Sequence, residues 1–149
     1  MTVRDEASPD AVPELDRPTV GKVLVVEDEA DLVWVIRFNL EMEGYRTYVA
    51  SNGEAALEML RTDPPDIMLL DLMMPVMDGW TVLEEISKRG LDRPKVIVVS
   101  ARTAAGDRAR AARYEVSGYM AKPFDMDELL EAIRAAVPPS AGSGVAREG

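Results

Sequence analysis

The sequence lacks histidine and cysteine altogether among its 149 residues. Without histidine it cannot build a Ser-His-Asp triad, a His-ligated zinc site or a His general base, and it cannot itself be a histidine phosphodonor. Without cysteine it has neither disulfides nor thiolate metal ligands, although this does not fix the redox compartment. The two absences exclude enzyme mechanisms that need an imidazole or a thiolate from this chain.

Long apolar runs and clustered positive charge are also missing. No run approaches the roughly 18 apolar residues that a membrane span needs, and the opening MTVRDEASPD is too acidic and polar for a secretory signal. We therefore expect a cytoplasmic protein without a membrane partner. Lys and Arg number 17 against 27 Asp and Glu, a net charge of −10. Because phosphate binding draws on clustered Lys and Arg, we expect no nucleic-acid binding through this chain alone.

The composition is that of one globular domain, with 47% hydrophobic and 30% charged residues. Residues 1–20 hold three prolines and seven charged residues without periodicity, which predicts a flexible N-terminal tail. Residues 138–149, PPSAGSGVAREG, have the small, polar composition of a flexible C-terminal tail or linker. The folded domain is therefore expected at 21–137.

Short apolar runs alternate with helical patterns through this domain. The runs predict strands at 22–26, 45–50, 66–71, 95–100 and 118–121. Helices are predicted at 30–43, from the capping-box spacing of Ser51 and Glu54 to about 61, at 80–89, at 103–114, and from an Asp125 cap to Pro138. Five strands alternating with five helices predict an α/β fold, a doubly wound five-stranded parallel sheet of the flavodoxin-like order 2-1-3-4-5.

Functional residues of such a sheet lie at the carboxyl ends of its strands. Glu27 and Asp28 follow the first predicted strand, Asp71 ends the third, Ser100 ends the fourth and Lys122 follows the fifth. In the order 2-1-3-4-5 the first and third strands are neighbours, so the three carboxylates converge in one crevice. Oxygen-only ligands suit a hard divalent cation such as Mg²⁺.

The charge balance of that crevice favours phosphoryl chemistry. Three negative charges from the carboxylates meet three positive charges from Lys122 and one Mg²⁺, so a phosphoryl anion can approach. Asp71 is then the candidate nucleophile, because carboxylates can carry covalent intermediates. The metal and Lys122 stabilise charge on the transferring oxygens.

Each of these residues also has an ordinary explanation when it is taken alone. An Asp after a strand is usually a turn residue or a helix cap, as we expect of Asp78, and Glu29 fits a first-turn helix acid. Lys122 alone would be an ordinary surface lysine. Their occurrence together at four strand ends favours the functional interpretation.

Four segments carry a resemblance to a known family. They are VLVVEDEADL at 23–32, PDIMLLDLMMPVMDGW at 65–80, VIVVSAR at 96–102 and GYMAKPFDMDEL at 118–129. In order and spacing they resemble the receiver domains of bacterial response regulators, the CheY-like modules of two-component signalling. The resemblance implies a phosphorylation-driven switch rather than an enzyme, one that catalyses only its own Mg²⁺-dependent phosphorylation and dephosphorylation.

The resemblance implies roles for the acidic residues. Asp71 matches the phosphoacceptor, and Asp28 matches the more direct Mg²⁺ ligand. Glu27 matches a ligand that acts largely through water. Met73 matches the position whose backbone carbonyl completes the metal site.

A second set of matches implies the switch. Ser100 matches a hydroxyl that moves to the phosphoryl oxygens, and Tyr119 matches an aromatic residue that turns inward behind it. Lys122 matches the lysine that pairs with the phosphoryl group, and the bond to Pro123 is cis in the family.

The sequence departs from the family pattern at two places. Val76 stands where glycine is usual, so the turn before Asp78 is expected to be less tight. The segment Glu115 to Gly118 replaces a usual Gly-Ala-Asp-Asp, which alters the surface beside the fourth helix, where output partners usually bind.

Trp34 and Phe38, at i and i+4 on the first predicted helix, fall outside the expected core stripe of Val33, Ile36 and Leu40. The resemblance implies that the kinase docks on this helix, which makes Trp34 a candidate partner surface. Packing of the two aromatic rings on their own helix is an equal alternative.

The expected phosphodonor is a sensor histidine kinase or a phosphotransfer protein, and the expected target is an output protein of unknown identity, with phosphorylation-dependent dimerisation as a further option. One alternative is the isolated input domain of a longer DNA-binding or enzymatic regulator. Another is a phosphorylation-independent interaction module, against which the intact Asp71 and Lys122 count. An aspartyl phosphatase needs a second acid two residues after its nucleophile, and Met73 occupies that position.

Overall fold

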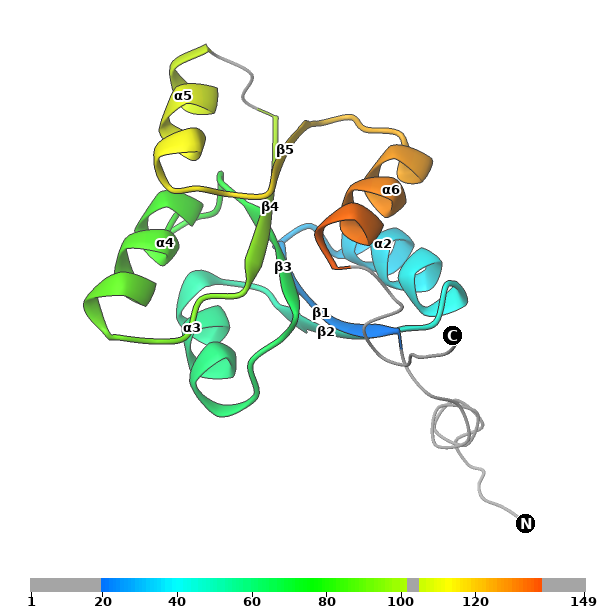
Figure 1. Ribbon diagram of the computed structural model, residues 1–149, viewed down its shortest axis with the longest axis horizontal. Helices are drawn as coiled ribbons and strands as arrows, with labels where there is room; N and C mark the ends of the chain where they lie inside the picture. The colour runs from blue at the N-terminus through cyan, green and yellow to red at the C-terminus, as the bar shows by residue number, and fades with distance from the viewer. Residues whose placement is uncertain (1–19, 102–104, 138–149) are drawn as a thin grey trace.

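Five parallel strands form one sheet in the order β2-β1-β3-β4-β5, as predicted (Figure 1). The computed structural model describes residues 20–101 and 105–137, so the predicted tails lie outside it apart from Val20. The strands are β1 (Gly21–Val26), β2 (Tyr45–Ala50), β3 (Ile67–Asp71), β4 (Lys95–Ser100) and β5 (Gly118–Ala121). The helices are α2 (Ala30–Met42), α3 (Gly53–Thr62), α4 (Gly79–Lys88), α5 (Ala105–Arg113) and α6 (Met126–Ala136).

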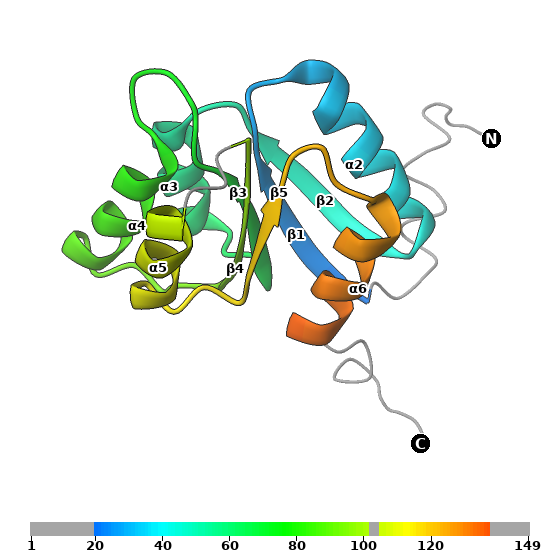
Figure 2. The ribbon, with the colours of Figure 1, turned by 90° about the horizontal axis from the view of Figure 1, so that it is seen from above.

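The helices lie in two layers, one on each face of the sheet. Helices α3, α4 and α5 cover one face, and α2 and α6 cover the other (Figure 2). The helix predicted from residue 103 is observed from Ala105, and its first two predicted residues fall outside the described part of the chain. No helix in that part combines the length and apolar character needed to cross a membrane.

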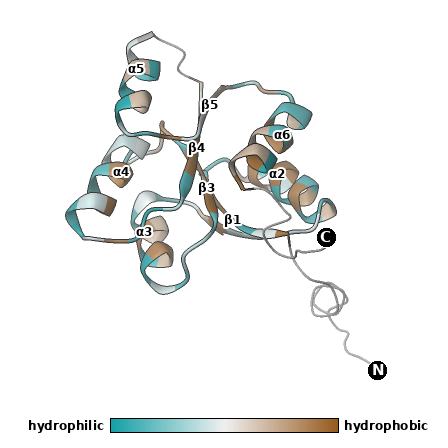
Figure 3. Ribbon diagram, in the orientation of Figure 1, coloured by the Kyte–Doolittle hydropathy of each residue, from teal (hydrophilic) through white to brown (hydrophobic). Residues whose placement is uncertain are grey.

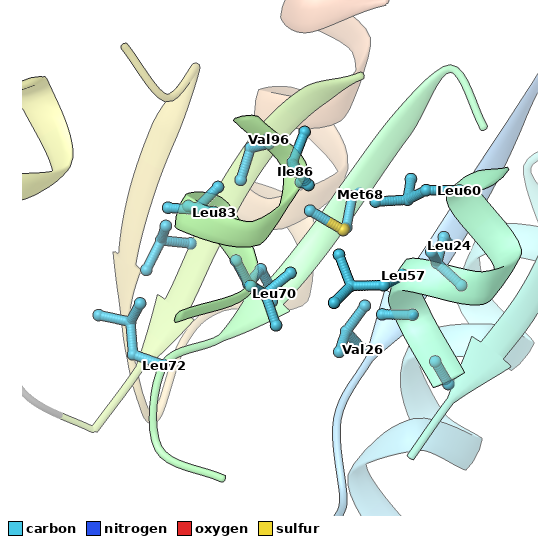
Figure 4. Packing of buried hydrophobic residues seen from close by; sticks show 14 of the residues in the cluster. Leu24, Val26, Leu57, Leu60, Met68, Leu70, Leu72, Leu83, Ile86 and Val96 are labelled. Carbon is cyan, nitrogen blue, oxygen red and sulfur yellow. The ribbon is translucent and has the colours of Figure 1, made fainter. Parts of the chain in front are cut away.

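The strands are apolar on both sides because each side is covered by helices. Alternate residues such as Leu24 and Met68 pack in the cluster beneath α3 and α4 (Figure 4). Their neighbours Leu69 and Ile97 pack in a second cluster with residues of α2 and α6. Apolar residues accordingly concentrate in the strands, while polar residues are frequent on the helices (Figure 3). This explains the uninterrupted runs VLVV, IMLL and VIVV in the sequence.

Among the described residues, three aspartate or asparagine side chains cap helices. Asp78 and Asp125 accept hydrogen bonds from backbone N–H groups of α4 and α6, each at 2.9 Å, as predicted. The predicted Ser51 cap is wrong by one residue, because Asn52 caps α3 by accepting from the Ala55 N–H at 2.8 Å. Gly53 then opens the helix at a position where a Cβ would lie 2.7 Å from the Met77 sulfur, which explains why this residue is glycine.

The turn before Asp78 is tight, contrary to the expectation from Val76. The Met77 N–H donates to the Pro75 carbonyl at 2.8 Å, and Val76 between them has φ of 69°. A three-residue turn of this kind is rare and strained, more so with a β-branched residue at its centre. The hydrogen bond and the cap at Asp78 hold the backbone in the conformation that glycine would adopt more easily.

We predict that Val76→Gly raises the free energy of unfolding by about 0.5–1 kcal/mol, because relief of the left-handed conformation exceeds the entropy that glycine adds to the unfolded chain. The Val76 side chain is fully exposed, so no buried contact is lost. Urea denaturation checks this. The same change at Val35, inside α2, is the control and should lower stability, because glycine is the poorer helix former by roughly 0.3–0.5 kcal/mol and the partly buried side chain is lost. A loss of stability in Val76→Gly would contradict the strain argument.

Candidate functional site

Asp71 lies at the carboxyl end of β3, in the middle of the sheet, with only 3% of its surface exposed. Its strand pairs with β1 on one side and β4 on the other, so residues after Val26 and Val99 converge on it. The Asp71 Oδ1 accepts a hydrogen bond from the Met73 N–H at 3.0 Å, and its Oδ2 lies 3.4 Å from the Lys122 Nζ. The carboxylate is therefore buried but held by two donors.

Lys122 links Asp71 to a second buried carboxylate. Its Nζ donates to the Glu27 Oε1 at 3.0 Å, and the other Glu27 oxygen accepts from the Glu29 N–H at 3.2 Å. Glu27 is 3% exposed, and the side chain of Lys122 is 17% exposed. Two buried carboxylates thus share one ammonium group.

The pKa values of Glu27 and Lys122 reflect their burial and their contact with each other. Burial raises the pKa of Glu27 above its ordinary value, the hydrogen bond from Lys122 lowers it, and the charge of Asp71 raises it further. Burial alone would lower the pKa of Lys122. Its hydrogen bond to Glu27 and the charge of Asp71 outweigh burial, so the pKa of Lys122 is raised. Lys122 therefore keeps its positive charge, and its hydrogen bond is the largest influence that lowers the pKa of Glu27.

Asp28 brings a third carboxylate to the same place. One oxygen from each of Glu27, Asp28 and Asp71 lies within 4.8 Å of the others, and Asp28 is exposed while the other two are buried. This is the convergence that the strand order predicts. An all-oxygen cluster open on one side has the donor chemistry that Mg²⁺ prefers.

The remaining predicted residues surround this cluster. Ser100 ends β4 and is fully buried, and its carbonyl accepts from the Lys122 N–H at 2.8 Å. Tyr119 lies on β5 opposite Val98. The peptide bond before Pro123 is cis. Met73 follows Asp71 with its side chain half exposed.

Trp34 lies apart from the cluster, on the exposed side of α2. It is 65% exposed and stacks on Phe38 with ring centroids 5.3 Å apart. Ile36 and Leu40 of the same helix are buried as expected, while Val33 is only partly buried.

The Glu29 side chain forms an ion pair with Lys122, which its expected place as a first-turn helix acid does not predict. Glu29 occupies the N-cap position of α2, but its side chain caps nothing and lies 3.6 Å from the Lys122 Nζ. Glu29 and Lys122 also border an open groove of 680 Å³ between the start of α2 and the segment after β5. The groove is lined by Glu29, Asp31, Leu32, Val35, Ala101, Lys122, Pro123, Phe124 and Met126. The only sequence signal for Glu29 was its position next to the acidic pair.

The sequence matches the response regulator receiver domain over residues 23–134, three quarters of the chain. The chain belongs to this family. Among full-length relatives, the receiver domain is 43% identical over 115 residues to the transcriptional regulatory protein KdpE of Mycobacterium tuberculosis, covering 77% of this chain and 50% of the relative. It is 34% identical over 114 residues to the alkaline phosphatase synthesis regulator PhoP of Bacillus subtilis, covering 76% and 47%. The chain spans about half the length of these curated relatives.

Solved receiver structures share the fold. A response regulator receiver domain from Francisella superposes with a TM-score of 0.74 at 28% identity, covering 83% of this chain and 99% of that one. The receiver domain of a sensor histidine kinase from Pseudomonas aeruginosa superposes with a TM-score of 0.70 at 29% identity, covering 83% and 98%. That structure holds a magnesium ion in its active-site cleft. Membership of the receiver family places this domain in two-component signalling.

We predict that Lys122→Ala lowers the free energy of unfolding by about 1–3 kcal/mol in the presence of a chelator, because Glu27 and Asp71 are left facing each other without a cation. The loss should be smaller than for a fully buried pair, since Lys122 is partly exposed. Added Mg²⁺ should restore part of the stability by replacing the lost charge. Urea denaturation with and without Mg²⁺ measures both effects.

Lys95→Ala is the matched control. Lys95 is exposed and makes no ion pair with a described residue, so its removal should change stability by less than about 0.5 kcal/mol. Equal losses in the two variants would show that Lys122 does not balance the buried carboxylates.

Proposed function

We propose that this receiver domain is a phosphorylation-dependent switch in which Asp71 accepts a phosphoryl group from a histidine kinase or a phosphotransfer protein. The observation that supports this most directly is the bridge from Lys122 to both Glu27 and Asp71 at the end of the sheet. It leaves a buried carboxylate beside a fixed cation, at the place where an approaching phosphoryl oxygen would be neutralised.

Mg²⁺ fits the three carboxylates as the proposed cofactor. Direct Mg²⁺ ligands at 2.0–2.1 Å lie about 3–4 Å from one another, and the cluster spreads over up to 4.8 Å. The fit therefore leaves room for one ligand to act through water. Lys122 lies closer to Glu27 than to Asp71, at 3.0 Å against 3.4 Å, so Glu27 is the carboxylate more fully engaged by the ammonium group. We therefore assign Asp28 and Asp71 as direct ligands, Glu27 as a water-mediated one, and the Met73 carbonyl as the proposed fourth protein group.

The proposed reaction is an in-line displacement at phosphorus. A carboxylate oxygen of Asp71 forms the new P–O bond, while the bond from phosphorus to the donor's histidine nitrogen breaks and its electron pair leaves with the imidazole. Mg²⁺ supplies charge neutralisation for the transferring oxygens when it is bound. Lys122 orients toward the same oxygens, and the Met73 N–H holds the second Asp71 oxygen in place.

The proposed output is a rearrangement of Ser100 and Tyr119. Ser100 ends the strand beside Asp71, one residue beyond the Asp71–Val99 pair, so its backbone lies next to the end of β3. Its movement toward the phosphoryl group would leave room for Tyr119, two strands from Asp71, to turn inward. Phosphorylation adds about 1.5–2 negative charges, which biases a two-state equilibrium of this kind.

The groove beside Lys122 is the face we propose for the phosphodonor. It shares Lys122 with the site, and its wall carries Leu32, Val35 and Phe124, which can bury apolar surface of a partner. Trp34 and Phe38 extend apolar surface along the same helix.

Input control of an attached domain is a second candidate for the output. It is supported by the names of the relatives, which are transcriptional regulators twice the length of the matched region. In this alternative the 138–149 segment acts as a linker, and the chemistry at Asp71 is unchanged. A protein that contains the receiver joined to such a domain would show phosphorylation-dependent output, while the chain alone would not.

We predict that incubation with Mg²⁺ and acetyl phosphate adds one phosphoryl mass to the chain, read by intact mass spectrometry. Asp71→Asn and a chelator should each abolish the gain, because one removes the nucleophile and the other removes the charge balance. Asp92→Asn, an exposed carboxylate outside the site, is the control and should be labelled as well as the wild type. Labelling of Asp71→Asn at the wild-type level would refute the assignment.

Mg²⁺ affinity should separate the roles of Asp28 and Lys122. Asp28→Ala removes a direct ligand, so calorimetric titration should show Mg²⁺ binding weakened by tenfold or more. Lys122→Ala removes a competing cation, so binding should be unchanged or tighter. An equal loss of affinity in the two variants would contradict this division.

A further inference from the structure

Helix α5 is held to the domain by few apolar contacts. Its sequence AGDRARAAR is the most polar of the five helices, and Ala111 is the one apolar side chain recorded as buried in it among the described residues. It lies beside α4 on the face that also carries α3 (Figures 1 and 2). Contacts from two of its arginines add to these few apolar contacts.

Two of these arginines lie over aromatic rings. The Arg108 guanidinium carbon is 4.7 Å from the centre of the Tyr119 ring on β5. The Arg110 guanidinium carbon is 4.4 Å from the Trp80 ring on α4. Trp80 also stacks on Tyr114, just after α5, with ring centroids 5.8 Å apart. The two arginine–ring distances fall within the range of cation–π attraction.

The two arginines contact different elements of the fold. Residues two apart on a helix point to nearly opposite sides of it, so Arg108 contacts the sheet while Arg110 contacts the neighbouring helix. Only Arg108 therefore touches the proposed switch residue. Arg110 makes the same kind of contact, with the same charge, to a residue outside the switch.

The geometry points to Arg108 as a positioning residue that holds the Tyr119 ring against α5 in the resting state and so opposes its inward turn. This inference rests on the proposed switch and extends it to α5. Inward rotation of Tyr119 breaks the contact with Arg108, and loss of the contact makes rotation easier. Loss of Arg108 therefore raises the population of the inward-ring state, and phosphorylation that proceeds through this state becomes faster in proportion to its population.

The test is the initial rate of phosphorylation by acetyl phosphate in the full chain, measured as mass gain with saturating Mg²⁺. Arg108→Gln is expected to raise the rate about two- to fivefold, the factor that a partly exposed cation–π contact represents. Arg108→Lys keeps a cation, so its rate should lie between those of the wild type and Arg108→Gln. Arg110→Gln, the matched control, should leave the rate at the wild-type level.

A double-mutant cycle shows whether the effect passes through the ring. In a Tyr119→Leu background, Arg108→Gln should no longer change the rate, and Mg²⁺ affinity should be the same in all variants. An unchanged or lower rate in Arg108→Gln, an equal gain in Arg110→Gln, or a full effect without the Tyr119 ring would each overturn the inference. A wild-type chain that takes no phosphoryl group under any of these conditions would instead reject the proposed switch itself, and the inference with it.

Discussion

The ammonium group of Lys122 between two buried carboxylates is the interaction on which the rest of the site depends. Glu27 and Asp71 come from the ends of adjacent parallel strands, and each is almost fully removed from water. Side by side and ionised, they would repel strongly in such a place. Lys122, which follows β5, neutralises part of this repulsion. The site keeps a net negative charge, which a divalent cation can balance.

The fold brings Glu27, Asp71 and Lys122 together because it places charged residues at one end of the sheet. The interiors of the central strands β1, β3 and β4 are apolar on both faces, so polar groups gather where these strands end. Helix α4 comes close behind Asp71, where a Cβ on Gly79 would lie 2.7 Å from the Asp71 carbonyl oxygen. The Gly79 N–H donates to the Leu72 carbonyl at 3.1 Å, which ties the helix to the strand end. Position and rigidity of Asp71 thus come from packing as much as from the charged residues.

Sequence reasoning predicted the strand order, the helix caps at Asp78 and Asp125, and the convergence of the carboxylates. These depend on local patterns and on the rule that parallel strands end at one edge. It placed the cap of α3 on Ser51 rather than on Asn52, because both are preferred N-cap residues and the local pattern does not choose between them. It also failed where the outcome depends on contacts with surrounding residues. The tight turn at Val76 is maintained against local preference by its neighbours.

The same limit applies to the site and to α5. Glu29 looked like a helix acid, and its distance from Lys122 depends on how β5 ends. The arginines of α5 looked like surface charges, and their aromatic partners are on β5 and α4. Both cases involve side chains that reach across elements far apart in the sequence. Charge patterning along one segment could not reveal them.

The most direct test of the account asks which carboxylate becomes phosphorylated. The chain would be treated with acetyl phosphate and Mg²⁺, reduced with borohydride, which converts an acyl phosphate to an alcohol, and digested with trypsin. Cleavage after Lys22 and Arg37 isolates Glu27 and Asp28 in one peptide, and cleavage after Arg61 and Lys88 isolates Asp71 in another. The account predicts reduction at Asp71 alone. Reduction at Glu27 or Asp28, or in both peptides equally, would contradict it.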